Sequence, residues 1–334
     1  MRLWRLLSLS LLVACGGNSP PASAPLPTVV DMGGPKLTHP QLVSITYSDD
    51  GDAAALADFA RWIVGSQWLA QVGADYGIGA GTVLATVALT TAAPDTTSDI
   101  AIVTSLYDGI DSGTLPTPAG GDFSDTLYMV HFPAHTTIKD PGQQSCTDYL
   151  AYHANARRNG REISYAVVAT CPGGLANVGT LESREVAASH EFIEAATDAI
   201  PANNPGWLVS DPTSAWQTLG GEVADLCERG DDSHDWVESG FTVQRIWSQS
   251  RAGKGEPCIP IPSPAPVFFT LDASPPGLRR VAVGGTTRYQ LAVHGSAVDL
   301  EAFSDTQGVS VKLGAAQLHD GDSTTVDVTL PASL

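Results

Sequence analysis

The chain has 334 residues and carries 36 acidic against 17 basic side chains, which gives a formal net charge of −19 at pH 7. The acids are spread along the chain, and a surface of this sign repels the phosphates of nucleic acids, so no nucleic-acid partner is expected. The sequence contains no P-loop, no dinucleotide-binding fingerprint and no Gly-X-Ser-X-Gly elbow. We therefore expect neither a nucleotide cofactor nor serine-hydrolase chemistry.

The start of the chain has the layout of a bacterial lipoprotein signal peptide. Arg2 and Arg5 precede a short apolar run, residues 6–14, and Cys15 follows Leu-Val-Ala as in a lipoprotein cleavage site. The run is too short to span a bilayer as a helix. We expect lipidation of Cys15, export, and anchoring at the bacterial cell surface, where Gly16 in place of Asp favours the outer membrane. An ordinary signal peptide with an incidental cysteine is the alternative.

Composition divides the chain into successive segments. They are a signal peptide (1–15), a flexible linker (16–36), an α/β domain (37–259), a Pro-rich linker (260–266) and a β-rich module (267–334). In the last segment, short alternating runs are separated by Gly and Asp turns, which is typical of an Ig-like β-sandwich. Because the segment is short for that fold, a truncated C-terminus is the alternative.

Within the α/β domain, apolar alternation predicts strands and helical spacing predicts helices. In chain order they are a strand at 42–47, a helix at 53–76, a strand at 83–89, a helix at 97–110, strands at 126–132 and 163–170, a helix at 181–200 and a strand at 241–247. This order indicates an α/β (α+β) fold with one mixed sheet.

Four further cysteines remain after Cys15, namely Cys146, Cys171, Cys227 and Cys258. An even number of cysteines in an exported protein indicates two disulfides, and four cysteines allow three pairings. We favour Cys146 with Cys171 and Cys227 with Cys258, because each pair brackets a compact segment. A cysteine-type zinc site is the competing interpretation, but no two of these cysteines are close in sequence.

The predicted helix at 181–200 carries the strongest chemical signal. It has no Gly or Pro and is rich in Ala and Glu. At about 100° per residue, His190, Glu194 and Asp198 lie along the edge of its apolar face, with Glu191 beside them. A purely structural helix would place its acids on the opposite, solvated side. The arrangement therefore predicts a site, and a lone histidine with solvated acids is the alternative.

Metal-dependent hydrolysis is the chemistry that this pattern favours. His190 and Glu194 are four residues apart and can bind one cation, and Glu191 can act as general base on water whose pKa the ion lowers. A zinc hydrolase also needs a third ligand from elsewhere.

The candidates for the third ligand lie downstream on the chain. They are Glu222 or Asp225, close to Cys227, with Asp198 as the other candidate. If Asp225 is not a ligand, it would orient the His190 ring through its other nitrogen. His153 is the preferred additional site residue, because it lies between two cysteines in a constrained segment. The expected ion is Zn²⁺, with Ca²⁺ as the alternative.

Two family resemblances follow from these motifs. Ser-His-Glu-Phe-Ile-Glu-Ala-Ala-Thr-Asp at 189–198, Pro-Gly-Trp at 205–207 and Gly-Glu-Val-Ala-Asp-Leu-Cys at 221–227 together resemble the bacterial branch of the phosphate-induced (EXORDIUM-like) family. That resemblance implies a secreted, cysteine-bridged protein of a family whose plant members are linked to cell-wall growth signalling. The chain is also similar to zincin metallopeptidases, which share a mixed sheet followed by a His-Glu helix. It departs from them at Glu194, where zincins have a histidine.

Two functions from different classes remain open. The first is an exported lipoprotein that hydrolyses peptide bonds with zinc. The second is a non-catalytic surface module that binds wall polymer and keeps only a structural or degenerate metal site. The expected partners are the membrane, through the lipid anchor, and a peptide or wall-polymer substrate.

Overall fold

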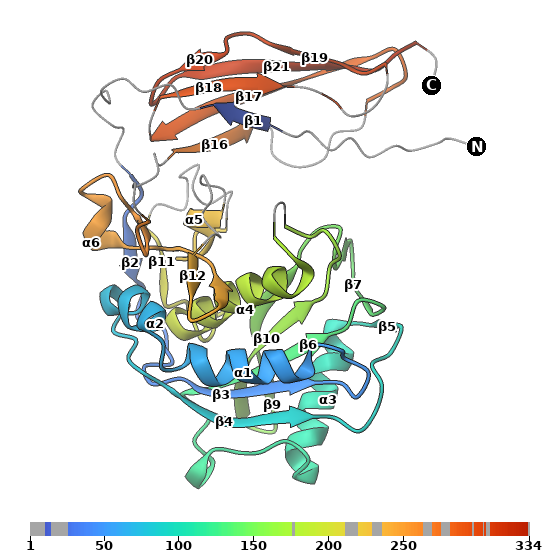
Figure 1. The fold of residues 1–334 in the computed structure, drawn as a ribbon, viewed down its shortest axis with the longest axis vertical. Coiled ribbons are helices and arrows are strands. Elements are labelled where there is room, and N and C mark those ends of the chain that lie inside the picture. Colours follow the sequence, from blue (N-terminus) through green and yellow to red (C-terminus); the bar gives the residue numbers. More distant parts are fainter. Residues whose placement is uncertain are drawn as a thin grey trace.

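A five-stranded mixed sheet in the order β4-β3-β6-β10-β9 forms the centre of the larger part of the molecule (Figure 1). Its strands are β3 (Gln41–Thr46), β4 (Thr82–Ala88), β6 (Thr126–Phe132), β9 (Ala151–Arg158) and β10 (Arg161–Ala169). The first four in sheet order run parallel, and β9 pairs antiparallel with β10 at the edge. The computed structural model describes residues 11–14, 26–175, 178–210, 220–228, 236–262, 269–274, 281–295, 297–302, 304 and 308–332.

The parallel strands confirm the sequence prediction, but the edge strand β9 was not predicted. Each parallel strand lies within two residues of its expected position. The residues of β9 are half-buried on both faces apart from the exposed Arg157, so the strand has no clean apolar alternation. The predicted α/β (α+β) class is therefore confirmed, but the strands form several small sheets besides the predicted mixed sheet.

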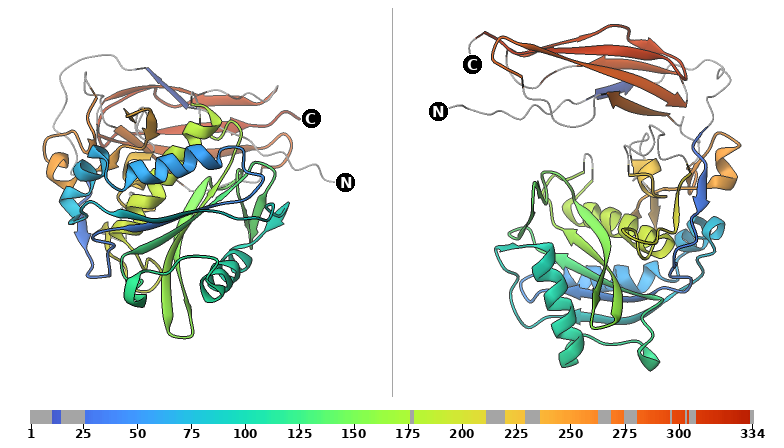
Figure 2. Two further views of the ribbon diagram at one scale, coloured as in Figure 1. Left: turned by 60° about the horizontal axis from the view of Figure 1, so that its bottom comes forward. Right: turned by 180° about the vertical axis from the view of Figure 1, so that it is seen from behind.

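Helices cover both faces of this sheet (Figure 2). On one face lie α1 (Ala53–Ile63) and α4 (Thr180–Thr197), and on the other lies α3 (Asp99–Ser112). Successive side chains of a strand point to opposite faces. Met129 of β6 accordingly packs in one core with Phe192, and its neighbour Val130 packs in the second core with Leu106.

The prediction of one continuous helix over 53–76 is wrong. The chain instead forms α1, the short α2 (Gln67–Val72) and a 3₁₀ turn, η1 (Ala74–Tyr76). The break lies at Gly65 and Ser66. The Ser66 hydroxyl accepts a hydrogen bond from the Leu69 N–H at 3.0 Å, which caps the new helix.

Helix α4 lies between the sheet and the segment that carries α5 (Asp225–Glu228) (Figure 1). Most of its residues are buried, including the small Ala187, Ala188, Ala195 and Ala196, which allow its neighbours to approach closely. The helix is predicted at 181–200 and ends at Thr197, with Asp198 as the capping residue. Its polar side chains are thus enclosed from both sides.

Short strand pairs complete this part of the structure, together with α6 (Gln249–Ala252) and a 3₁₀ turn, η2 (Ala119–Gly121). The pairs are β2 (Val29–Asp31) with β11 (Trp207–Val209), β12 (Trp236–Glu238) with β13 (Phe241–Val243), and β14 (Ile246–Trp247) with β15 (Cys258–Ile259). A further small sheet contains β5 (Thr96–Thr97), β7 (Thr137–Asp140) and β8 (Gln143–Gln144). The strand predicted at 241–247 is therefore interrupted at 244–245.

Both predicted disulfides are confirmed. Cys146 pairs with Cys171, and Cys227 pairs with Cys258, at Cα–Cα distances of 5.2 and 5.8 Å. The second bridge joins α5 to β15 and so fixes the segment that follows residue 220. Cys15, the predicted lipidation site, lies outside the described residues. Among the residues that are described, no helix combines the length and apolar character needed to cross a membrane.

The described residues after 267 form strands and no helix, as the alternating runs predict. They are β16 (Phe269–Ser274), β17 (Thr286–Gly295), β18 (Val298–Ala302), β19 (Ser310–Leu313), β20 (Gln317–Leu318) and β21 (Ser323–Thr329). Four of them form the sheet β16-β17-β21-β19, and β18 and β20 form a second sheet with β1 (Leu11–Ala14). A separate apolar core includes Val293, Leu300 and Val326.

Candidate metal centre

Histidine and carboxylate side chains from three segments meet beside α4. We call them the His–carboxylate cluster, and its members are His153 of β9, His190, Glu191 and Glu194 of α4, and Glu222 and Asp225 of the segment that leads into α5. Two groups of ligand atoms within the cluster could hold a metal ion. His190, Glu194 and Asp225 form one, His153, Glu194 and Glu222 form the other, and within each group the atoms lie within 4.8 Å of one another.

The first group is built on one turn of α4. His190 and Glu194 are four residues apart and therefore lie on the same face of the helix. The His190 Nε2 is 3.1 Å from the Glu194 Oε2 and 3.7 Å from the Asp225 Oδ1. The Asp225 N–H also donates to the Glu194 Oε1 at 3.2 Å, so the backbone of one ligand positions the side chain of another.

Gln244 fixes the orientation of the His190 ring. Its Oε1 lies 2.9 Å from the His190 Nδ1, and its Nε2 donates to the Ala224 carbonyl at 2.7 Å. Because the amide nitrogen is used as a donor, the Oε1 must accept, and the His190 Nδ1 must carry a hydrogen. The His190 Nε2 is then the atom available for a metal ion, as in metal sites whose ligand histidine is held through its other nitrogen.

Sequence reasoning did not identify Gln244. It lies 54 residues after His190, between the short strands β13 and β14. No spacing or motif connects a single glutamine in an apolar segment with a distant histidine. The contact exists because the Gln244 N–H donates to the buried Ser189 hydroxyl at 3.0 Å, which aligns this segment with α4.

The second group brings in His153, the additional site residue suggested by the sequence. Its side chain is only 4 % exposed. The Nδ1 lies 3.3 Å from the Glu191 Oε2 and 3.5 Å from the Glu194 Oε2, and the Nε2 lies 3.4 Å from the Glu222 Oε1. The sequence left the third ligand open between Glu222 and Asp225, and the structure brings both to Glu194, one in each group.

The electrostatics of the cluster reflect an excess of acids over bases. Burial raises the pKa of Glu191 and of Glu222, and burial next to Glu194 raises the pKa of Asp225 to about 8. Burial opposes the charged form of His190, yet the nearby carboxylates of Glu194 and Glu191 raise its pKa well above the usual value. Four carboxylates thus face two imidazoles in a largely buried space, which is an environment that attracts cations.

Asp198, the other candidate for a third ligand, belongs to neither group. It is fully buried at the end of α4, and its Oδ1 accepts a hydrogen bond from the Gly206 N–H at 2.9 Å. This contact stabilises the turn that follows the helix, and the Asp198 Oδ2 is buried without a hydrogen-bond partner.

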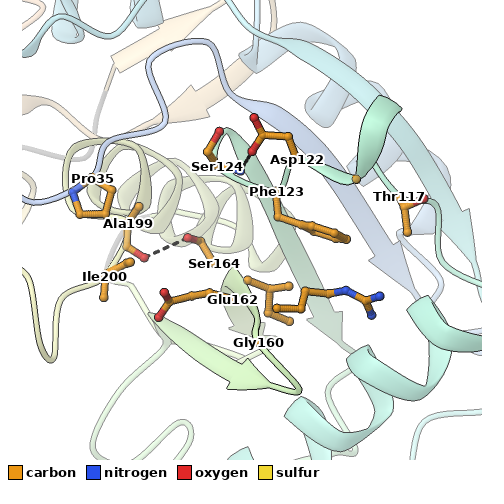
Figure 3. Close-up of a pocket in the computed structure, with 13 residues that line it drawn as sticks. Pro35, Thr117, Asp122, Phe123, Ser124, Gly160, Glu162, Ser164, Ala199 and Ile200 are labelled. Carbon is orange, nitrogen blue, oxygen red and sulfur yellow. Dashed lines mark hydrogen bonds between the residues drawn. The ribbon is translucent and has the colours of Figure 1, made fainter.

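The cluster is not part of the open cavity drawn in Figure 3. That cavity has a volume of about 620 Å³ and lies where β6 and β10 begin, with Phe123, Glu162 and Ser164 in its wall. None of the cluster residues lines it. The most exposed side chains of the cluster are those of His190, Asp225 and Glu222, at 13 %, 15 % and 18 %.

Comparison of the chain with protein-family models, with curated proteins and with solved structures gives no match. The function is therefore inferred from the geometry and chemistry of the residues described above.

Proposed function

We propose that the protein is an exported, lipid-anchored, zinc-dependent hydrolase that acts on peptide bonds. The observation that carries the proposal is the His190 ring, which Gln244 holds through Nδ1 so that Nε2 faces Glu194 and Asp225. One imidazole and two carboxylates are a suitable set for a catalytic zinc ion, which takes three protein ligands and keeps an open position. Calcium is disfavoured, because it prefers six to eight oxygen ligands and no imidazole.

Glu191 is the general base in this proposal. A divalent cation held by His190, Glu194 and Asp225 supplies Lewis-acid activation of water and of the scissile carbonyl. Glu191 follows His190 directly on α4, is 5 % exposed, and has one oxygen fixed by the His153 ring. Burial raises the pKa of Glu191, which suits a base that takes a proton from the attacking water near neutral pH and passes it to the leaving amine.

Further features support the remaining parts of the proposal. The mixed sheet with an antiparallel edge strand, followed by a His-Glu helix, supports a zincin-like domain. The strands after residue 267 support an Ig-like module, and the predicted signal peptide supports export and a peptide or wall-polymer substrate at the cell surface. Membership of the EXORDIUM-like family is proposed on the sequence motifs at 189–198 and 221–227.

Metal analysis of the purified full chain tests this function. We expect bound zinc in the wild type, and no zinc at this site in His190→Ala. Glu191→Gln should keep the zinc and lose peptide hydrolysis. A chain that purifies without metal and gains no thermal stability from added Zn²⁺ would overturn the proposal. Retained zinc with no hydrolysis in either wild type or Glu191→Gln would favour the polymer-binding module with a structural metal site.

A further inference from the structure

We propose that a second divalent cation binds between His153 and Glu222, and that Glu194 contributes a ligand to both ions. The centre would then hold two cations joined by one carboxylate. This inference rests on the proposed metal site at His190, Glu194 and Asp225, and it adds an ion that the proposed reaction does not require.

Two buried polar atoms without hydrogen-bond partners mark the second position. They are the His153 Nε2 and the Glu222 Oε1, which lie 3.4 Å apart. Buried polar atoms are nearly always hydrogen-bonded, and a bound ion is one way in which such a pair is satisfied. Two ligand atoms bound at about 2.1 Å to the same ion lie roughly 3 to 3.5 Å apart. The spacing of this pair therefore suits a shared cation.

The hydrogen-bonding of His153 prepares its Nε2 for metal binding. The Nδ1 faces the Glu191 Oε2 at 3.3 Å and the Glu194 Oε2 at 3.5 Å, and both atoms are acceptors. The contact with Glu191 is the hydrogen bond, so a hydrogen on Nδ1 is donated to Glu191 and leaves the lone pair on Nε2, toward Glu222. Glu194 then remains available as a ligand. His190 is oriented in the same sense by Gln244, so each histidine has its Nδ1 occupied and its Nε2 free for an ion.

Glu194 lies between the two histidines. Its Oε2 is 3.1 Å from the His190 Nε2 and 3.5 Å from the His153 Nδ1, and it is the one residue common to both groups. Among the residues that the structure describes, no group of mutually close ligand atoms contains both histidines. Two ions on either side of Glu194 fit this arrangement better than one ion that draws both imidazoles to itself.

The charge of the cluster agrees with two ions. Glu191, Glu194, Glu222 and Asp225 contribute four negative charges when ionised, the buried Asp198 nearby adds a fifth, and neutral histidine ligands contribute none. One divalent cation leaves more than half of that charge uncompensated in a buried space, and a second compensates most of it. Paired cations about 3.5 to 4 Å apart are a recognised design of hydrolytic enzymes, in which both ions hold the attacking and leaving groups.

Zinc titration of the chelator-treated full chain, followed by calorimetry and metal analysis, tests the second site. We expect two Zn²⁺ per wild-type chain. Glu222→Gln and His153→Ala should each bind one Zn²⁺, with at least about a tenfold loss of affinity for the other. His190→Ala should also bind one. Glu185→Gln is the matched control, because Glu185 is a buried acid of α4 that accepts from the Thr242 N–H and lies outside the cluster; it should bind two.

The possible failures of the two proposals can be told apart. One Zn²⁺ per chain that is lost in His190→Ala but unaffected by Glu222→Gln would overturn the second site and leave the proposed function in place. No bound zinc would overturn both. If Glu222→Gln still binds two ions, the second ion does not bind between His153 and Glu222. Because His153→Ala can disturb β9, Mn²⁺ loading provides a second readout on the near-isosteric Glu222→Gln. The electron spin resonance of the wild type should show two coupled ions, and that of Glu222→Gln a single ion.

Discussion

Helix α4 contributes to two buried ionic clusters that are balanced in different ways. Near its start, the Arg184 guanidinium is 1 % exposed and donates two hydrogen bonds to Asp50, at 3.0 and 2.6 Å, and one to Asp52 at 3.0 Å. The buried His131 lies close enough to Arg184 and Asp50 for their charges to shift its pKa. We call these four residues the Arg184 cluster. Its buried cation has its partners within the chain.

The His–carboxylate cluster, about two turns further along α4, is not balanced in this way. Its four carboxylates outnumber its two histidines, and it contains no arginine or lysine. Burying an ionised group without a partner is costly, so a protein keeps such a group only where something compensates for it. The contrast between the clusters shows that buried charge alone is a poor indicator of a site. An excess of buried negative charge that no cation of the chain neutralises is a better indicator of a site.

The largest effect that this comparison predicts is the loss of stability when Arg184 is replaced. Arg184→Met leaves the Asp50 carboxylate buried without its cation, and we expect a loss of about 3–5 kcal/mol in the free energy of unfolding. Urea denaturation measures it. The double variant Asp50→Asn with Arg184→Met should recover part of the loss, because no buried charge remains. Arg61→Met is the control, since the Arg61–Asp58 pair is 56 % and 70 % exposed and should contribute at most about 1 kcal/mol. Equal losses in Arg184→Met and Arg61→Met would contradict this view of the cluster.

The next largest effect is the pH dependence that His131 gives to the Arg184 cluster. Burial and the Arg184 charge lower the pKa of His131 to about 3. Unfolded chains take up this proton near pH 6.5, and the folded protein does not until about pH 3. The unfolding free energy therefore falls as pH drops below 6.5, by up to about 1.4 kcal/mol per pH unit. When the pH is lowered from 6.5 to 5, the free energy of unfolding, measured with urea, should fall by about 2 kcal/mol less in His131→Leu than in the wild type. Parallel curves for the two proteins would show that His131 is not the cause.

Much of this arrangement could be predicted from the sequence, because it follows from local rules. The i, i+4 spacing of His190 and Glu194 places both on one face of any helix. The apolar periodicity predicted one buried face, whereas α4 is buried on nearly every side. The disulfides could be paired because each brackets a short segment. Whether Glu222 or Asp225 would reach the helix could not be decided, since that depends on how the segment after residue 220 turns. The structure places one of them in each of the two groups that could hold an ion.

The features that were missed depend on tertiary contacts alone. Strand β9 carries His153 and has half-buried residues on both faces, so only its pairing with β10 reveals it as a strand. Gln244 has no pattern of its own, and its role follows from packing against Ser189 and Ala224. Sequence patterns thus predicted the ligands on α4, whereas the residues that orient and complete the centre came from parts of the chain without a periodic signal.

The smallest predicted effect tests directly whether the His–carboxylate cluster needs a cation. Burial and the nearby acids raise the pKa of Glu222 well above its usual value. The folded protein therefore holds this proton over a pH range in which the unfolded chain has lost it, and the unfolding free energy falls as pH rises above about 4.5. In chelator-treated protein at pH 8, Glu222→Gln should be more stable than the wild type, and at pH 4 that difference should disappear.

Added Zn²⁺ should reverse that order. Both proteins bind the ion at His190, but the ion between His153 and Glu222 binds the wild type more tightly and stabilises it further by mass action, by up to about 2.7 kcal/mol at a hundred times its dissociation constant. Glu185→Gln shows whether the response to zinc is specific to Glu222 or follows from the replacement of any buried acid. Burial raises the pKa of Glu185 to about 7, so its replacement should alter the pH dependence in the same direction. Because Glu185 lies outside the cluster, zinc should stabilise Glu185→Gln as much as the wild type. If zinc fails to reverse the order for Glu222→Gln, or reverses it equally for both variants, no ion binds between His153 and Glu222.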